Sequence, residues 1–185
     1  QMANTCLDYC YSDDLREIEI ISCGVDPKGG VFAVLLLECN NQLTNPSSGT
    51  AINTEIAAGR ATLIERCSLS LEKPSPVTQE SIIPCESATL VTYERKGTYK
   101  NPNVTQQNVI FHNGLFDGRN FGGLILFYCG DDDDLWVDWI DSTVKFTGGR
   151  VIPVKDTEVQ LFDGEFTYRA KKDPLRYSAP TGVLG

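Results

Sequence analysis

The sequence predicts an all-β protein, or a β-rich protein with one or two short helices, in which residues 1–185 form a single antiparallel β-sandwich or barrel. Three observations predict this class. Several segments alternate apolar and polar residues with a period of two, two further segments are apolar on both faces, and turn sequences stand between them. Strands at this spacing favour a sandwich or barrel over repeated β-α-β units.

Alternation marks the half-buried strands, beginning at residues 16–20, where acidic side chains alternate with isoleucines. In residues 66–72, Cys67, Leu69 and Leu71 point to one face and the polar residues between them to the other. Residues 31–37 and 123–128 are apolar on both faces, which is typical of central strands. Noisier alternation predicts further strands at 89–95, 108–111, 143–147, 158–162 and 165–169.

Turn-forming sequences separate these strands. Asn-Gly and Asp-Gly pairs favour tight hairpin turns, because both central positions need a positive φ. The candidate turns are 26–30, 45–49, Lys96-Gly97, Asn113-Gly114, Asp117-Gly118, Gly148-Gly149 and Asp163-Gly164.

Two short helices are expected. Residues 53–58 begin with a capping asparagine and are followed by a glycine, which is enough for a short helix. The acidic run 131–134 is expected to open a second helix over residues 135–140, because carboxylates stabilise a helix N-terminus. Trp136 and Trp139 would share the buried face of that helix with Ile140.

Two proline-bearing segments are expected to extend from the domain. Residues 72–88 are predicted to form a long loop or hairpin arm, and residues 171–185 an extended C-terminal arm, because proline cannot donate a hydrogen bond within a central strand. We expect both segments to mediate assembly through prolines and apolar anchors, namely Pro74, Pro76, Val77, Leu175, Tyr177, Val183 and Leu184.

Composition excludes some classes of partner. The chain has 16 Lys and Arg against 25 Asp and Glu, a net charge of −9, which disfavours wrapping nucleic acid because that binding depends on neutralising phosphates. The longest apolar run, 31–37, is far shorter than the roughly 20 residues that cross a bilayer, so no membrane partner is expected. The seven cysteines form an odd set, several within strand-like runs, and we expect them to be reduced and structural.

No catalytic constellation stands out, and we expect neither enzymatic activity nor a cofactor. The one histidine, His112, precedes Asn113-Gly114 and is interpreted as a strand-end or turn residue. A serine or cysteine nucleophile needs a base held against it, and the sequence has no Gly-x-Ser-x-Gly elbow. Paired carboxylates for acid–base chemistry stay an alternative, because acidic residues are plentiful.

The run Asp131, Asp132, Asp133 and Asp134 is the sharpest charge feature. One interpretation is a calcium loop, because Ca²⁺ prefers several carboxylate oxygens on a flexible turn. The internal glycine and distal glutamate of a calcium-binding loop are absent, however, and a charge run is more often a solvated face. No metal site is therefore the first expectation, with calcium as the alternative.

A two-proline connection lies between strand-like residues 67–71 and 88–95, and closing strands run from 143–147 to 165–169. With the chain length, the acidic balance and the all-β pattern with a short helix, this order resembles the tail tube proteins of long-tailed bacteriophages. The resemblance implies a subunit that forms rings, usually hexamers, which stack into a tube in the virion after assembly in the bacterial cytoplasm. Its partners would be copies of itself and other virion proteins, with DNA only as non-specific cargo, and part of Asp131–Asp134 would line a lumen or a ring face.

Two other functions are compatible with the same pattern. A different virion role, such as head decoration, tail completion or a neck ring, would use the same fold in a discrete assembly. A monomeric carbohydrate-binding module would use exposed aromatic rings as stacking platforms, with Tyr93, Tyr99, Tyr128 and Tyr168 as candidates.

Overall fold

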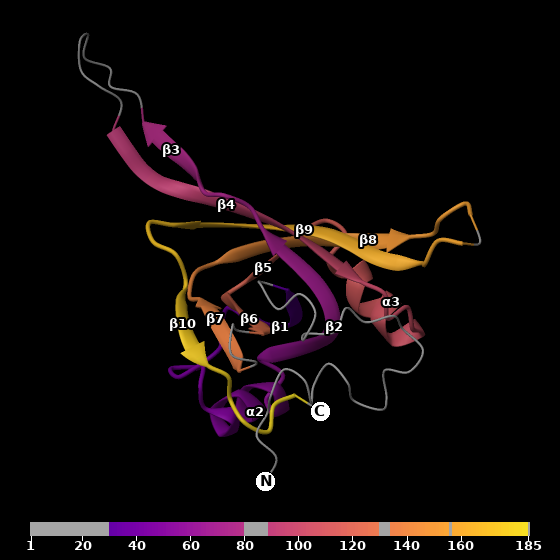
Figure 1. The fold of residues 1–185 in the computed structure, drawn as a ribbon, viewed down its shortest axis with the longest axis horizontal. Helices are drawn as coiled ribbons and strands as arrows, with labels where there is room; N and C mark the ends of the chain where they lie inside the picture. Colours follow the sequence, from indigo (N-terminus) through magenta and orange to yellow (C-terminus); the bar gives the residue numbers. More distant parts are fainter. Residues whose placement is uncertain (1–29, 80–88, 130–133, 156, 185) are drawn as a thin grey trace.

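One antiparallel sheet contains every strand of the described structure, which confirms the all-β class. The computed structural model describes residues 30–79, 89–129, 134–155 and 157–184. The strands are β1 Val31–Leu37, β2 Ala61–Leu71, β3 Ser75–Gln79, β4 Thr89–Asn101, β5 Arg119–Phe121, β6 Gly123–Cys129, β7 Leu135–Ile140, β8 Val144–Val151, β9 Leu161–Ala170 and β10 Leu175–Ser178. The helices are α2 Gly49–Ala57 and α3 Gln106–Asn113 (Figure 1). The strand order is β10-β7-β6-β1-β2-β4-β9-β8-β5, and β3 pairs with β4 outside this path.

Two apolar clusters lie on opposite faces of β1, which pairs with β2 and β6 at the middle of the sheet. Val34 and Leu36 point into the larger cluster, whereas Ala33 and Leu35 point into the smaller one, as the alternation of side chains along a strand requires. All four side chains are fully buried, which confirms the central strand predicted at 31–37.

The larger cluster joins the two halves of the sheet. Leu124 and Leu126 of β6 pack there with Phe146 of β8 and Phe166 of β9, although these strands are far apart in the strand order. The sheet therefore folds over itself in a β-sandwich-like arrangement. The smaller cluster is covered by α2 and by the C-terminal segment, which contributes the buried Val183.

Most of the predicted strands are present. The alternation at 66–72 lies largely within β2, that at 89–95 within β4, and those at 143–147 and 165–169 fall on β8 and β9. The strand predicted at 158–162 overlaps only the start of β9. The strand predicted at 16–20 lies outside the described residues.

Two elements have a different secondary structure from the predicted one. Residues 108–111, predicted as a strand, lie in α3, where the Asn108 backbone N–H donates to Thr105 Oγ1 at 3.2 Å and caps the helix. Residues 135–140, predicted as a helix, form β7, in which Leu135 and Val137 are buried two residues apart and pair with β6. The helix predicted at 53–58 is confirmed within α2, which begins earlier because the N-cap Ser48 precedes it.

Three dipeptides that contain glycine and were predicted as turns lie inside strands: Lys96-Gly97 in β4, Gly148-Gly149 in β8 and Asp163-Gly164 in β9. A Cβ on Gly97 would overlap the Phe166 ring and the backbone oxygen of Ser70, and one on Gly164 would overlap the Thr147 backbone oxygen. These glycines allow neighbouring strands and rings to approach closely, which a turn-based interpretation of the sequence did not consider.

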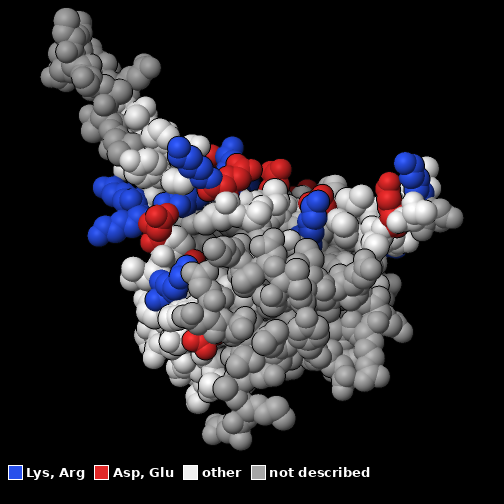
Figure 2. Space-filling model, in the orientation of Figure 1, with Lys and Arg blue, Asp and Glu red and all other residues white. Residues whose placement is uncertain are grey.

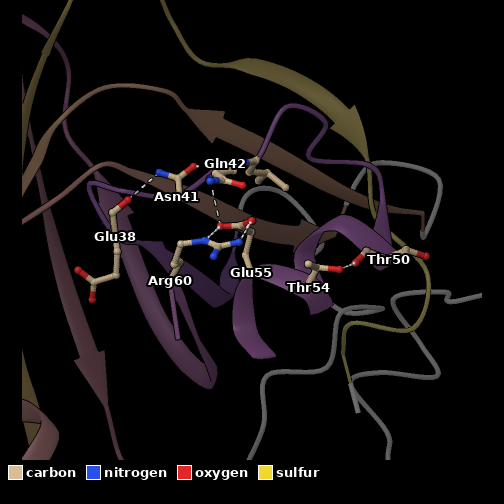
Figure 3. A network of polar contacts seen from close by, with 8 residues as sticks. Glu38, Asn41, Gln42, Thr50, Thr54, Glu55 and Arg60 are labelled. Carbon is tan, nitrogen blue, oxygen red and sulfur yellow. Dashed lines mark hydrogen bonds and ion pairs between the residues drawn. The ribbon is translucent and has the colours of Figure 1, made fainter. Parts of the chain in front are cut away.

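Glu55 of α2 connects the helix to two other segments (Figure 3). Its carboxylate accepts hydrogen bonds from Arg60 Nε and Nη2, both at 2.8 Å, and from the Gln42 backbone N–H at 3.0 Å. The hydrogen bonds from Arg60 lower the pKa of Glu55 to about 2. Glu55 therefore stays ionised near neutral pH and holds α2 against the loop after β1 and against Arg60, the residue before β2.

Candidate assembly surfaces

The first candidate surface is the hairpin formed by β3 and the first half of β4. Ser75 pairs with Glu94 and Gln79 with Thr89, and the pair of strands stands out from the body (Figure 1). Pro76 is exposed and Val91 is 44% exposed, so this ribbon has little apolar packing of its own. A two-stranded ribbon is marginally stable in water, and contact with another molecule would stabilise it.

The predicted assembly residues on this hairpin differ in exposure. Pro74 and Val77 are half-buried, whereas Pro76 is exposed at the position opposite Tyr93. The segment 72–88 thus includes a paired strand in its described part. Whether these side chains contact another subunit stays a prediction.

The C-terminal segment lies along the body, where the sequence led us to expect an extended arm. β10 pairs with β7, and the Ala179 backbone N–H donates to the Leu135 oxygen at 3.0 Å. The reason is that the outer edge of β7 needs hydrogen-bond partners, which residues 175–179 provide.

Apolar side chains of the C-terminal segment also pack on the body. Tyr177 lies against Trp139 with ring centroids 6.3 Å apart, while Val183 and Leu184 pack on the smaller cluster beside α2. Of the four predicted assembly residues in this segment, Leu175 is the one left largely exposed, at 68%. Three of them therefore have contacts within their own subunit.

A second projecting hairpin, formed by β8 and β9 (Figure 1), has several exposed apolar side chains at its tip. Val151, Ile152, Val154 and Val159 are exposed by 45, 62, 103 and 69% respectively. Sequence reasoning assigned residue 159 to a strand and did not consider this tip as a surface. The run Val-Ile-Pro-Val at 151–154 was the available signal, because a proline within an apolar run rarely belongs to a buried strand.

His112 lies inside the protein, at the end of α3, and not at a strand end or in a turn as predicted. Its Nδ1 is 2.7 Å from the Asn108 backbone oxygen, which can only accept, so Nδ1–H donates and Nε2 accepts from the Tyr99 hydroxyl at 3.0 Å. The ring stacks on Phe162 with centroids 3.8 Å apart. Burial lowers the pKa of His112, so the ring is neutral at neutral pH and both its nitrogens are occupied.

The acidic run falls mainly outside the described residues, which include Asp134 of the four aspartates. Asp134 is exposed immediately before β7. Within the described ranges, no group of three or more His, Cys, Asp or Glu side chains is arranged to hold a metal ion. The calcium and lumen interpretations of Asp131, Asp132 and Asp133 therefore remain predictions.

Three of the four tyrosines considered as sugar-stacking platforms are buried. Tyr99, Tyr128 and Tyr168 are 0, 7 and 3% exposed, and Tyr93 is half-buried. The prediction of exposed rings was wrong for these three residues, because each belongs to a strand face that packs inward or, for Tyr128, is covered by Arg176 at 5.1 Å. Their positions give no support to a flat sugar-binding platform.

Comparison of the chain with protein-family models, with curated proteins and with solved structures gives no match in any of the three. In the described part of the chain, neither helix has the length and apolar character needed to cross a bilayer.

Proposed function

We propose that this protein is a structural subunit that associates with copies of itself, as the tail tube subunit of a bacteriophage does. The observation that carries the proposal is the pair of hairpins, β3–β4 and β8–β9, that project from different sides of one sandwich-like body (Figure 1). Both hairpins have exposed apolar side chains that do not pack on the apolar clusters of the body. Such ribbons are suited to bridge neighbouring subunits.

Charge is compatible with a tube that conducts DNA. The chain carries a net charge of −9, and on this proposal an acidic lumen wall, to which part of Asp131–Asp134 would contribute, would repel phosphate groups so that DNA passes without adhering. Figure 2 shows basic and acidic side chains together around the base of the β3–β4 hairpin, so charged groups of both signs are available there for contacts between subunits. On this proposal the protein belongs to the virion, with copies of itself and other virion proteins as partners.

Negative-stain microscopy of the purified protein over a range of concentrations and salt tests the proposal. We expect hollow rods of constant diameter. Isolated rings would instead favour the alternative virion roles, such as a neck ring or tail completion, because these need one closed assembly. Monomers at every concentration would overturn both.

A variant with a shortened β3–β4 hairpin tests whether this hairpin takes part in assembly. Ser75 pairs with Glu94, so replacing residues 76–93 by Asn-Gly closes the ribbon with a two-residue turn at an existing pair. We expect the variant to keep the far-ultraviolet circular dichroism of the body and to lose stacking. Unchanged rods from this variant would show that the hairpin has no part in assembly.

A further inference from the structure

A cavity of about 370 Å³ lies where β7 and β9 end beside the segment that leads into β10. Its walls combine aromatic, apolar and charged side chains, among them Trp139, Tyr168, Leu175, Asp141, Lys171 and Lys172. The cavity was not among the features that the sequence suggested. Two of its lining residues, Leu175 and Tyr177, are among the predicted assembly residues.

Unpartnered polar atoms gather at this cavity. Among the described residues, four buried side-chain polar atoms have no hydrogen-bond partner: Arg95 Nε, Trp139 Nε1, Ser142 Oγ and Tyr168 Oη. Three of these residues line the cavity, and the fourth is bonded to its wall, since Arg95 Nη2 lies 2.6 Å from Asp173 Oδ1. Arg95 and Tyr168 are only 4 and 3% exposed. An unpaired buried polar atom costs about 1–3 kcal/mol, so a group of four calls for a missing partner.

The chemistry of these atoms restricts what fits. An arginine Nε–H and an indole N–H can only donate, so the occupant must offer acceptors such as carbonyl oxygens. Ile140, Pro174 and the 68%-exposed Leu175 supply apolar wall beside these donors. An extended peptide segment offers both carbonyl oxygens and apolar side chains, so it matches these walls.

The tip of the β8–β9 hairpin has these properties. Its apolar side chains at 151, 152, 154 and 159 are exposed, and Pro153 has no N–H, so the tip carries an excess of backbone acceptors over donors. β5 pairs only with residues 144–146 of β8, which leaves the outer edge of residues 147–151 without a strand partner in the described structure. Lys155 and Glu158 at the tip are exposed and complement Asp141 and the basic Lys171–Lys172 pair beside the cavity.

The tip and the cavity lie at opposite ends of one strand. β9 begins at Leu161, opposite Val151 at the tip, and ends at Ala170 in the cavity wall. Its ten residues span roughly 30 Å, so the tip cannot reach the cavity of its own subunit. A second copy can provide it, and each subunit then gives one tip and receives another.

We propose that the β8–β9 tip of one subunit inserts into the cavity at Trp139 and Tyr168 of the next, in a head-to-tail contact. This inference rests on the self-association proposed above and assigns one of its contacts. Trp139, Ser142 and Tyr168, which line the cavity, would then turn their unpartnered donors toward backbone oxygens of the incoming hairpin. Repeated contacts of this kind close into a ring when the rotation between subunits permits it.

Two exposed substitutions test the contact. Val154→Glu alters the tip and Leu175→Glu alters the cavity rim, and both side chains are too exposed for the change to disturb folding. We expect each variant to raise the concentration for half-assembly at least about tenfold, since that is a loss of only about 1.4 kcal/mol per contact. The control Ile110→Glu places the same charge on an exposed apolar position of α3 and should assemble as the original chain does.

Mixing the two variants distinguishes a head-to-tail contact from a symmetric one. The Leu175→Glu copy keeps an unaltered tip and the Val154→Glu copy keeps an unaltered cavity. At a concentration at which neither variant assembles alone, the mixture should therefore form one-to-one heterodimers in sedimentation velocity. Equal weakening by the control, or assembly of either variant at the original concentration, would overturn the inference. If the shortened β3–β4 hairpin abolishes assembly while these variants assemble normally, self-association stands and this contact is wrong.

Tyr168→Phe should have opposite effects on the stability of the monomer and on assembly. Removing the unpartnered hydroxyl should leave the melting temperature of the monomer unchanged or raised, because a buried unsatisfied group is lost. The same change should weaken assembly, because a donor to the incoming hairpin is lost. A variant that lowers the melting temperature and assembles normally would show that the hydroxyl has a partner inside its own subunit.

Discussion

Replacing Glu55 by glutamine isolates the contribution of one charge to the packing of α2 (Figure 3). Glutamine has nearly the same volume and keeps one oxygen, but it turns an NH₂ group toward the donors of Arg60 or Gln42. At least one charge-assisted hydrogen bond is lost, and such bonds are worth about 1.5–3 kcal/mol each. Arg60 keeps 24% of its side chain exposed and can regain water, which limits the loss. We therefore expect the free energy of unfolding to fall by about 2 kcal/mol at pH 7.

The pH dependence of this difference follows from the lowered pKa of Glu55. A carboxyl whose pKa is lower in the folded state stabilises the protein above its unfolded pKa, and this stabilisation is lost as the pH falls toward the folded value. The folded pKa of Glu55 is about 2, so the difference between the original chain and Glu55→Gln should be full at pH 7 and shrink between about pH 4.5 and pH 2.

Urea unfolding at pH 7, 4 and 2.5 measures that difference. Glu72→Gln, at an exposed position, is the matched control and should change stability by less than about 0.5 kcal/mol at each pH. A difference for Glu55→Gln that stays constant from pH 7 to 2.5 would show that the charge does not stabilise the fold. A difference for Glu55→Gln that is no larger than that of Glu72→Gln would lead to the same conclusion.

Three further outcomes follow from packing and burial. Gly97→Ala should lower the unfolding free energy by about 3 kcal/mol in urea titrations, because the new methyl group overlaps a ring and a strand backbone, while Gly30→Ala, with open space around it, should be nearly neutral. Thr105→Ala removes the N-cap of α3 and should lower the free energy of unfolding by about 1 kcal/mol, measured by thermal melting. Thr105→Ser keeps a capping hydroxyl and should restore the stability. Iodoacetamide followed by peptide mass mapping should label the exposed Cys39 well before Cys67, whose pKa burial raises to about 12; equal rates would contradict this burial.

The sequence predicted best where hydrophobic period and burial agree. Residues 31–37 and 123–128 form the two central strands β1 and β6, because continuous apolar runs of this length are typical of strands that are buried on both faces. Residues 135–140 were predicted wrongly because a preceding acidic run favours a helix locally, whereas pairing with β6 and β10 on both sides stabilises a strand. Here tertiary hydrogen bonds outweigh a local preference.

Neither the cavity nor the His112 cluster was accessible to sequence reasoning. The cavity joins Trp139, Ser142 and Tyr168, which come from two strands and a turn and share no motif, and Arg95 of a third strand reaches its wall through Asp173. His112 meets Tyr99 because α3 packs against β8, beside the cluster that contains Tyr99. Single-sequence patterns report the local period of side chains, and both of these groupings depend on the register between distant strands.

The rigidity of β9 connects the fold to the proposed assembly. β9 is paired along nearly its whole length, with β4 on one side and β8 on the other. The tip at its start and the cavity at its end are therefore held at a fixed distance and angle within each subunit. In a head-to-tail ring, that fixed relation sets the rotation from one subunit to the next, so the strand pairing that stabilises the monomer also determines how many copies close the ring.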